Sequence, residues 1–124
     1  MADTELTQRL AAMLNKPLFV AFRETKDAAR MAELLPQHLD WAVAAERRGQ
    51  LFASGPFAVS DGAPGSAGGM TILRAGSQEE AEAILAEDPF IREKVVVATV
   101  RKWIVMEGGL TVTIRFSGQT GQIL

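Results

Sequence analysis

The stretch Ala32–Pro56 constrains the fold of this 124-residue chain most, because a helical repeat ends there at a glycine and an apolar strand follows at once. At about 100° per residue, apolar side chains and the only histidine of the chain fall within about 60° of one direction, at Leu34, Leu35, His38, Ala42 and Ala45. Gly49 is a typical residue just beyond a helix end, and Leu51–Phe57 is apolar enough for a buried strand. The stretch therefore predicts an amphipathic helix, with His38 in the middle of its apolar face, that leads into a strand.

The remaining patterns complete an alternating order of strands and helices. Pro36 allows two starts for the helix above: near Leu35, with Pro36 in the first turn, or between residues 26 and 34, with a kink at Pro36. Ser77 and Glu80 form a capping box that opens a second helix, which ends near Glu87 because the next residue precedes a proline. The other expected elements are an N-terminal helix over Thr4–Asn15, strands over Leu18–Arg23, Met70–Ala75, Lys94–Met106 and Leu110–Phe116, and a polar, loosely held tail from Ser117.

This order is β-α-β-β-α-β, the ferredoxin-like order of an α+β fold, with an extra N-terminal helix and an extra C-terminal strand. We expect one domain, made of a helical extension (residues 1–16), a ferredoxin-like core (17–106) and a C-terminal strand and tail of the same domain (107–124). Two helices cover only one face of such a sheet, so the other face needs a partner. We therefore predict a homodimer or a higher homo-oligomer.

Composition excludes several classes of function. Thirteen basic and 15 acidic residues give a net charge of −2, without the basic surface that nucleic-acid binding requires. No apolar run approaches the roughly 20 residues that span a bilayer, and the acidic, polar start is unlike a secretory or transit signal. The chain has no cysteine and one histidine, which argues against a metal site. We expect a soluble, cytoplasmic protein that uses no metal.

Several segments together resemble the YCII-related (YciI-like) family, over residues 17–104 and in the order and spacing of that family. They are Gln37–Leu39, Gly49–Phe57, Gly68–Leu73, Ala81–Phe90 and a strand that ends at Trp103. The resemblance implies a dimeric α/β barrel and a cofactor-free enzyme, related to muconolactone isomerases and, in one branch, to dehydrochlorinases that remove HCl from chlorinated hydroxyhydroquinones. It also implies an active-site pair, His38 and Asp88.

Each member of this pair has a structural interpretation beside the functional one. A half-buried neutral imidazole at His38 suits a general base, but a histidine on an apolar helix face is often a satisfied core residue. Asp88 would orient the ring and stabilise the imidazolium, but an aspartate before a proline is also a standard helix N-cap.

Five further residues are candidates for binding substrate. Ser54 and Gly55 end a strand with exposed backbone amides, and Ser54 is also a less favoured candidate for a Ser/His/Asp arrangement. Trp41 and Phe57 suit stacking on a flat substrate, or core packing. Arg23 suits an anionic group, or a solvated surface. The Gly-rich segment Val59–Gly69 is a candidate lid.

Three functional hypotheses follow. The leading one is a cofactor-free enzyme in which His38, assisted by Asp88, removes a proton from a cyclic or aromatic-derived small molecule and promotes isomerisation or elimination, with dehydrochlorination as one form. The first alternative is a non-catalytic ligand-binding or regulatory dimer. The second is an assembly module in which Thr4–Asn15 and Leu110–Phe116 build a higher oligomer.

Overall fold

A computed structural model describes residues 2–124, and Met1 of the predicted N-terminal extension lies outside the described residues. The chain divides into two compact units. One comprises Pro17–Ile104, and the other comprises the segment up to Lys16 together with Val105–Leu124. Whether residues 107–124 share a domain with the core stays a prediction.

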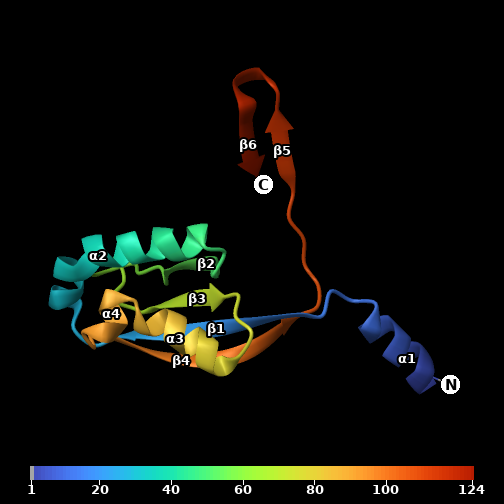
Figure 1. Cartoon of the computed structure of the whole chain (residues 1–124), viewed down its shortest axis with the longest axis horizontal. Coiled ribbons are helices and arrows are strands. Elements are labelled where there is room, and N and C mark those ends of the chain that lie inside the picture. Colours follow the sequence, from blue (N-terminus) through green and yellow to red (C-terminus); the bar gives the residue numbers. More distant parts are fainter. Residues whose placement is uncertain (1) are drawn as a thin grey trace. The chain divides into compact units, whose positions relative to one another are not determined.

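A four-stranded sheet with the order β2-β3-β1-β4 forms the larger unit (Figure 1). Its strands are β1 (Lys16–Thr25), β2 (Leu51–Pro56), β3 (Gly69–Leu73) and β4 (Val96–Val105). Strand β3 is antiparallel to both β1 and β2, with Ala21 and Ser54 opposite Thr71 on its two sides. This is the ferredoxin-like arrangement that the order of sequence patterns predicts.

Helix α2 (Ala28–Arg47) is a single 20-residue helix with Pro36 inside it. The Asp27 carboxylate caps its start by accepting the Arg30 N–H at 3.0 Å. The interpretation that begins this helix near Leu35 is therefore wrong. At its other end Gly49 has φ +77°, a left-handed conformation that favours glycine over other residues.

Two further helices follow β3. Ser77 caps α3 (Gln78–Ala86) by accepting the Glu80 N–H at 3.1 Å, while the Glu80 carboxylate reaches back to the Gly76 N–H at 2.8 Å. The predicted capping pair is therefore present, with the return bond one residue earlier than in the standard box. Asp88 then caps the short helix α4 (Pro89–Arg92), whose first residue is the proline that ended the predicted helix.

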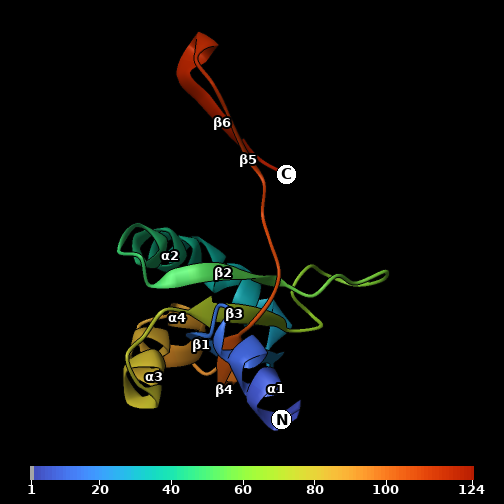
Figure 2. The same ribbon diagram turned by 90° about the vertical axis from the view of Figure 1, so that its right-hand side faces the viewer.

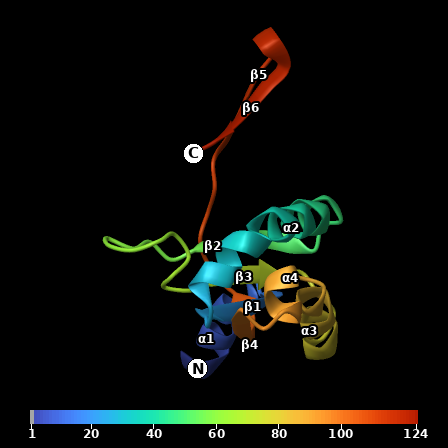
Figure 3. The same ribbon diagram turned by 90° about the vertical axis from the view of Figure 1, so that its left-hand side faces the viewer.

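Helices α2, α3 and α4 lie on one face of the sheet (Figures 2 and 3). They bury an apolar core that includes Phe19, Ala21, Trp41, Leu73 and Leu85. Alternate residues of β1 and β4 point to the other face, where Phe22, Val97 and Trp103 are each more than 40% exposed. Leu18 and Val20 of the same face are buried, so the open apolar surface from which the sequence predicts a partner is the part around Phe22, Val97 and Trp103.

The smaller unit contains α1 (Ala2–Ala11) and a hairpin of β5 (Val112–Arg115) and β6 (Thr120–Ile123). The hairpin corrects one expectation, since the tail from Ser117 is not loosely held. Strand β6 consists mostly of polar and small residues, so no apolar alternation marks it in the sequence. In the structure, Val112 pairs with Ile123 and Arg115 pairs with Thr120. Among residues 2–124, no helix is both long and apolar enough to cross a bilayer.

Candidate functional site

A cavity of about 330 Å³ lies within the larger unit, between α2 and the sheet. Helix α2 contributes His38 and Leu39 to its wall, β2 contributes Ser54 and Gly55, and α4 contributes Phe90. Arg23 of β1 also lines it. Four of the seven predicted site residues therefore meet at one cavity.

Asp88 lies directly behind His38, fully buried, at the start of α4. Its Oδ1 is 2.8 Å from His38 Nδ1 and also accepts the Phe90 N–H at 3.0 Å. One carboxylate therefore caps a helix and contacts the imidazole, so the structural and functional interpretations of Asp88 do not exclude each other. The His38 side chain is 17% exposed.

Arg23 faces the other carboxylate oxygen. Its Nη1 lies 2.8 Å from Asp88 Oδ2, and its side chain is only 8% exposed. The N–H of Nη1 does not point at Oδ2, so this contact is an ion pair rather than an aligned hydrogen bond. Burial raises the pKa of Asp88, but the His38 hydrogen bond, the charges of Arg23 and His38 and the Phe90 N–H outweigh it and hold the pKa below its ordinary value.

The lowered pKa of Asp88 assigns the proton on His38. An ionised carboxylate only accepts hydrogen bonds, so Nδ1 is the nitrogen that carries hydrogen. In the neutral ring, Nε2 then has a free lone pair, and His38 lines the cavity. This arrangement provides a proton acceptor at the cavity wall and a carboxylate that stabilises the imidazolium formed when the proton arrives.

Thr71, which the sequence analysis missed, joins Arg23 to the strand that carries Ser54. Arg23 Nε donates to Thr71 Oγ1 at 2.6 Å, and the hydroxyls of Thr71 and Ser54 are 2.8 Å apart. Thr71 is fully buried on β3, directly opposite Ser54 in the register of the sheet. Thr71 precedes the apolar Leu73 by two residues, so it lies on the same face of the predicted strand. A polar residue at such a position is the signal that could have identified it.

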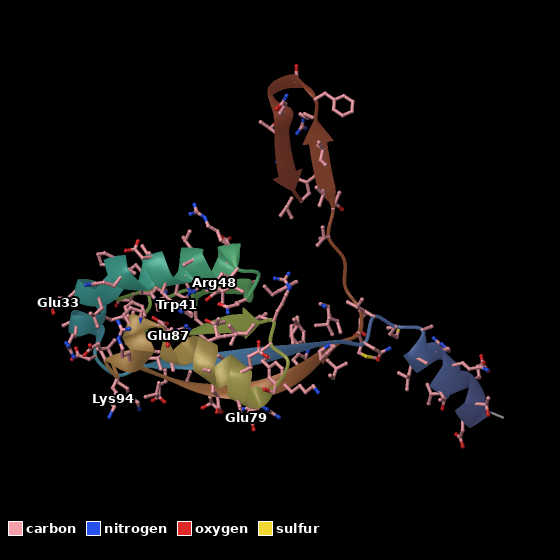
Figure 4. All side chains as sticks on the ribbon, viewed as in Figure 1. Glu33, Trp41, Arg48, Glu79, Glu87 and Lys94 are labelled. Atoms are coloured by element: carbon pink, nitrogen blue, oxygen red, sulfur yellow. The ribbon has the colours of Figure 1, made fainter. Side chains whose placement is uncertain are left out.

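Two aromatic rings contact the imidazole, and neither Trp41 nor Phe57 lines the cavity. Phe90 stacks on His38, with ring centroids 4.1 Å apart, and Trp41 lies 5.8 Å away at 37°. Trp41 borders instead a groove of about 250 Å³ between α2 and α3, whose wall includes Arg48 and Glu87 (Figure 4). Phe57 is 44% exposed just after β2. Their roles in substrate binding stay predictions.

The segment between β2 and β3 contributes Pro64, Gly65, Gly68 and Gly69 to the cavity wall. Gly65 has φ +85°, its carbonyl accepts the Thr25 hydroxyl at 2.6 Å, and a Cβ there would lie 2.5 Å from Met31 Cε. The positive φ favours glycine at this position, whereas Met31 Cε is the end of a flexible side chain that could move aside for a Cβ. That the segment acts as a lid stays a prediction.

Within residues 2–124, no three His, Asp or Glu side chains gather closely enough to hold a metal ion. The cytoplasmic location and the independence from cofactors and nucleic acids stay predictions from the sequence.

The order of the elements and the pairing of the strands define a ferredoxin-like α+β fold, the subunit fold of dimeric α/β barrels. Residues 17–104 match the YCII-related domain. The chain belongs to the YCII-related family, as its sequence motifs predict. A solved structure with this fold is 5-chloro-2-hydroxyhydroquinone dehydrochlorinase (TftG) from Burkholderia phenoliruptrix AC1100, in complex with 2,5-dihydroxybenzoquinone. It superposes with a TM-score of 0.56 and 20% sequence identity, over 69% of this chain and 92% of that one. No curated protein sequence matches the chain significantly.

Proposed function

We propose that this protein is a small-molecule enzyme in which His38 is the general base and Asp88 its partner. The observation that supports the proposal is the 2.8 Å contact between Nδ1 of His38, which lines the cavity, and the fully buried Asp88 behind it. A base for proton abstraction needs a free lone pair, and the neutral Nδ1–H form of histidine supplies one at Nε2. The cavity volume of about 330 Å³ suits a substrate of one ring.

The proposed step transfers one proton from substrate carbon or oxygen to His38 Nε2. The electron pair of the broken C–H or O–H bond forms a new double bond in the substrate. In an isomerisation, the imidazolium returns the proton at another atom. In an elimination, the pair expels a leaving group such as chloride, and the proton then passes from His38 to water. Neither route needs an oxidant or a reductant.

The dehydrochlorinase relative supports elimination as the first reaction to test. The test substrate is 5-chloro-2-hydroxyhydroquinone, and the readout is chloride release over the uncatalysed rate. His38→Gln should lower turnover by about 10²–10⁴-fold, the range that a general base contributes. Glu87→Gln, beside Asp88 in sequence but exposed, is the control and should leave turnover unchanged.

A non-catalytic ligand-binding dimer remains the alternative, and the same cavity would serve it. Binding and chloride release, both measured with 5-chloro-2-hydroxyhydroquinone, distinguish the enzyme from the non-catalytic binder. An enzyme loses chloride release in His38→Gln while it still binds the compound, whereas a pure binder holds the compound and releases no chloride even as the unaltered protein. If the unaltered protein neither binds nor converts it, dehydrochlorination of this compound is excluded.

We also propose that two copies pair through the open face of the sheet. Phe22, Val97 and Trp103 expose apolar surface there, on the side opposite the helices. Burying such a face against a symmetric copy is the usual solution at this chain length.

A further inference from the structure

The polar groups around the cavity differ in whether they donate or accept hydrogen bonds. His38 Nε2 accepts, as argued above, and a second polar wall is formed by Ser54 of β2. The direction of the hydrogen bonds that reach Ser54 can be worked out from chemistry, beginning at Arg23.

Arginine has only donors, so Arg23 Nε must donate its hydrogen to Thr71 Oγ1, 2.6 Å away. Thr71 is fully buried, and its own hydroxyl hydrogen needs an acceptor. Among the described residues, Ser54 Oγ, at 2.8 Å, is the only other hydrogen-bond partner of that hydroxyl. Thr71 therefore donates to Ser54, and the chain of bonds runs from Arg23 through Thr71 to Ser54.

This direction leaves the hydroxyl hydrogen of Ser54 free. Ser54 lines the cavity and makes no hydrogen bond to His38 among the described residues, which argues against a Ser/His/Asp arrangement. Arg23, whose side chain is more than nine-tenths buried and whose charge is paired with Asp88, donates through Nε to Thr71 and so polarises the Thr71 hydroxyl that donates to Ser54. A hydroxyl polarised in this way donates a stronger hydrogen bond to a negative oxygen.

We infer that Ser54 is the donor that binds the substrate's oxygen, and that Thr71 is the positioning residue that directs it. This inference rests on the function proposed above and names the substrate class. The substrate is a single ring with a carbonyl or hydroxyl oxygen that becomes negative when the substrate loses a proton to His38. The donor and the base lie on different elements, β2 and α2, so they can contact different atoms of one ring. A donor aimed at developing negative charge is the general means by which enzymes stabilise enolates and phenolates.

The test measures binding rather than turnover, so that it can fail independently of the proposed function. The probes are 4-nitrophenol, at a pH where it is largely ionised, and 4-nitrotoluene, which has a methyl group in place of the oxygen. Titration calorimetry is run on the full chain and on Ser54→Ala. Ser117→Ala, at an exposed serine of the smaller unit and outside the cavity wall, is the matched control.

Ser54→Ala should weaken binding of 4-nitrophenolate by at least about tenfold, as expected for a lost hydrogen bond to a charged oxygen, and should leave 4-nitrotoluene unchanged. Thr71→Val should weaken binding of the phenolate as much as Ser54→Ala does. Thr71→Ser keeps the hydroxyl and should bind the phenolate like the unaltered protein. A merely structural role for Thr71 would weaken both probes equally.

The inference is overturned if Ser54→Ala binds the phenolate as tightly as the unaltered protein, if both probes lose affinity together, or if the unaltered protein does not bind the phenolate. If the protein releases chloride but Ser54→Ala does not weaken phenolate binding, His38 remains the proposed base and only the role of Ser54 is overturned. If Ser54→Ala weakens phenolate binding but the protein has no turnover, the role of Ser54 stands and the proposed enzymatic function is overturned.

Discussion

The ring of Phe90 lies flat against the ring of His38, with centroids 4.1 Å apart and planes 7° from parallel. Phe90 follows Asp88 by two residues, so the first turn of α4 supplies both the carboxylate that holds Nδ1 and the ring that supports the imidazole plane. Fixing the position of the base in two directions keeps its lone pair oriented without a cost at the moment of reaction.

Phe90 should therefore be important for stability as well as for orientation. It is 5% exposed and packs in a second core cluster with Val95 and Val96. Phe90→Ala should lower the free energy of unfolding by about 3–5 kcal/mol in urea titrations, the usual cost of removing a buried aromatic ring. Phe116→Ala, at a phenylalanine that is 96% exposed, is the control and should change it by less than about 0.5 kcal/mol. Equal losses in the two variants would contradict the packing described here.

The ion pair of Arg23 and Asp88 predicts an asymmetric response to mutation. Asp88→Asn keeps the shape but leaves a buried guanidinium without its counter-charge, which should cost about 3–5 kcal/mol of unfolding free energy. Combining it with Arg23→Met should recover part of that loss, because no buried charge then remains. Chemical denaturation of the two single variants and the double variant measures the coupling, and purely additive losses would show that the two side chains do not interact.

Acid should weaken the fold through Asp88. Its pKa in the folded protein lies below the ordinary value of 3.8, so between the two values the unfolded chain binds more protons than the folded chain. The stabilisation is therefore complete above the ordinary pKa and is lost as the pH falls through the folded pKa. Urea midpoints from about pH 6 to about pH 2 should decline less steeply for Asp88→Asn than for the unaltered protein. Parallel curves would contradict the lowered pKa.

The open face of the sheet predicts how the oligomer can be broken. Phe22→Asp places a charge on that face and should convert the proposed dimer to monomer in sedimentation measurements, since an unpaired buried charge is costly. Leu6→Asp on α1 is the control, at a leucine that is 54% exposed in the smaller unit. A loss of mass in Leu6→Asp alone would favour assembly through the N-terminal helix instead.

Local patterns predict much of this fold, because caps and stops are chemistry of neighbouring residues. Ser77 with Glu80, and Gly49 beyond α2, act as their types suggest. Pro36 misled one interpretation of α2, since the Asp27 cap and tertiary packing carry the helix through it. The hairpin strand β6 escaped detection because Thr120–Ile123 lacks an alternating apolar pattern.

The site is partly visible in the sequence and partly a product of strand register. His38 is conspicuous as a lone histidine, and its pairing with Asp88, 50 residues away, rests on a family resemblance. Thr71 becomes important only because register places it opposite Ser54 and within reach of Arg23. Trp41 borders the groove between α2 and α3 and lies outside the cavity wall, which the helical pattern alone does not distinguish.

The most direct test of the account is the tautomer of the imidazole. Because His38 is the only histidine in the chain, ¹⁵N-labelled histidine gives one pair of ring nitrogen signals that needs no assignment. In the neutral ring, Nδ1 should be protonated and bonded to Asp88, and Nε2 should be unprotonated. The Nε2 signal should move when a ring substrate binds, and the tautomer preference should weaken in Asp88→Asn. If the neutral ring of the unaltered protein instead carries its hydrogen on Nε2, no proton acceptor faces the cavity, and the proposed role of His38 as the base is contradicted.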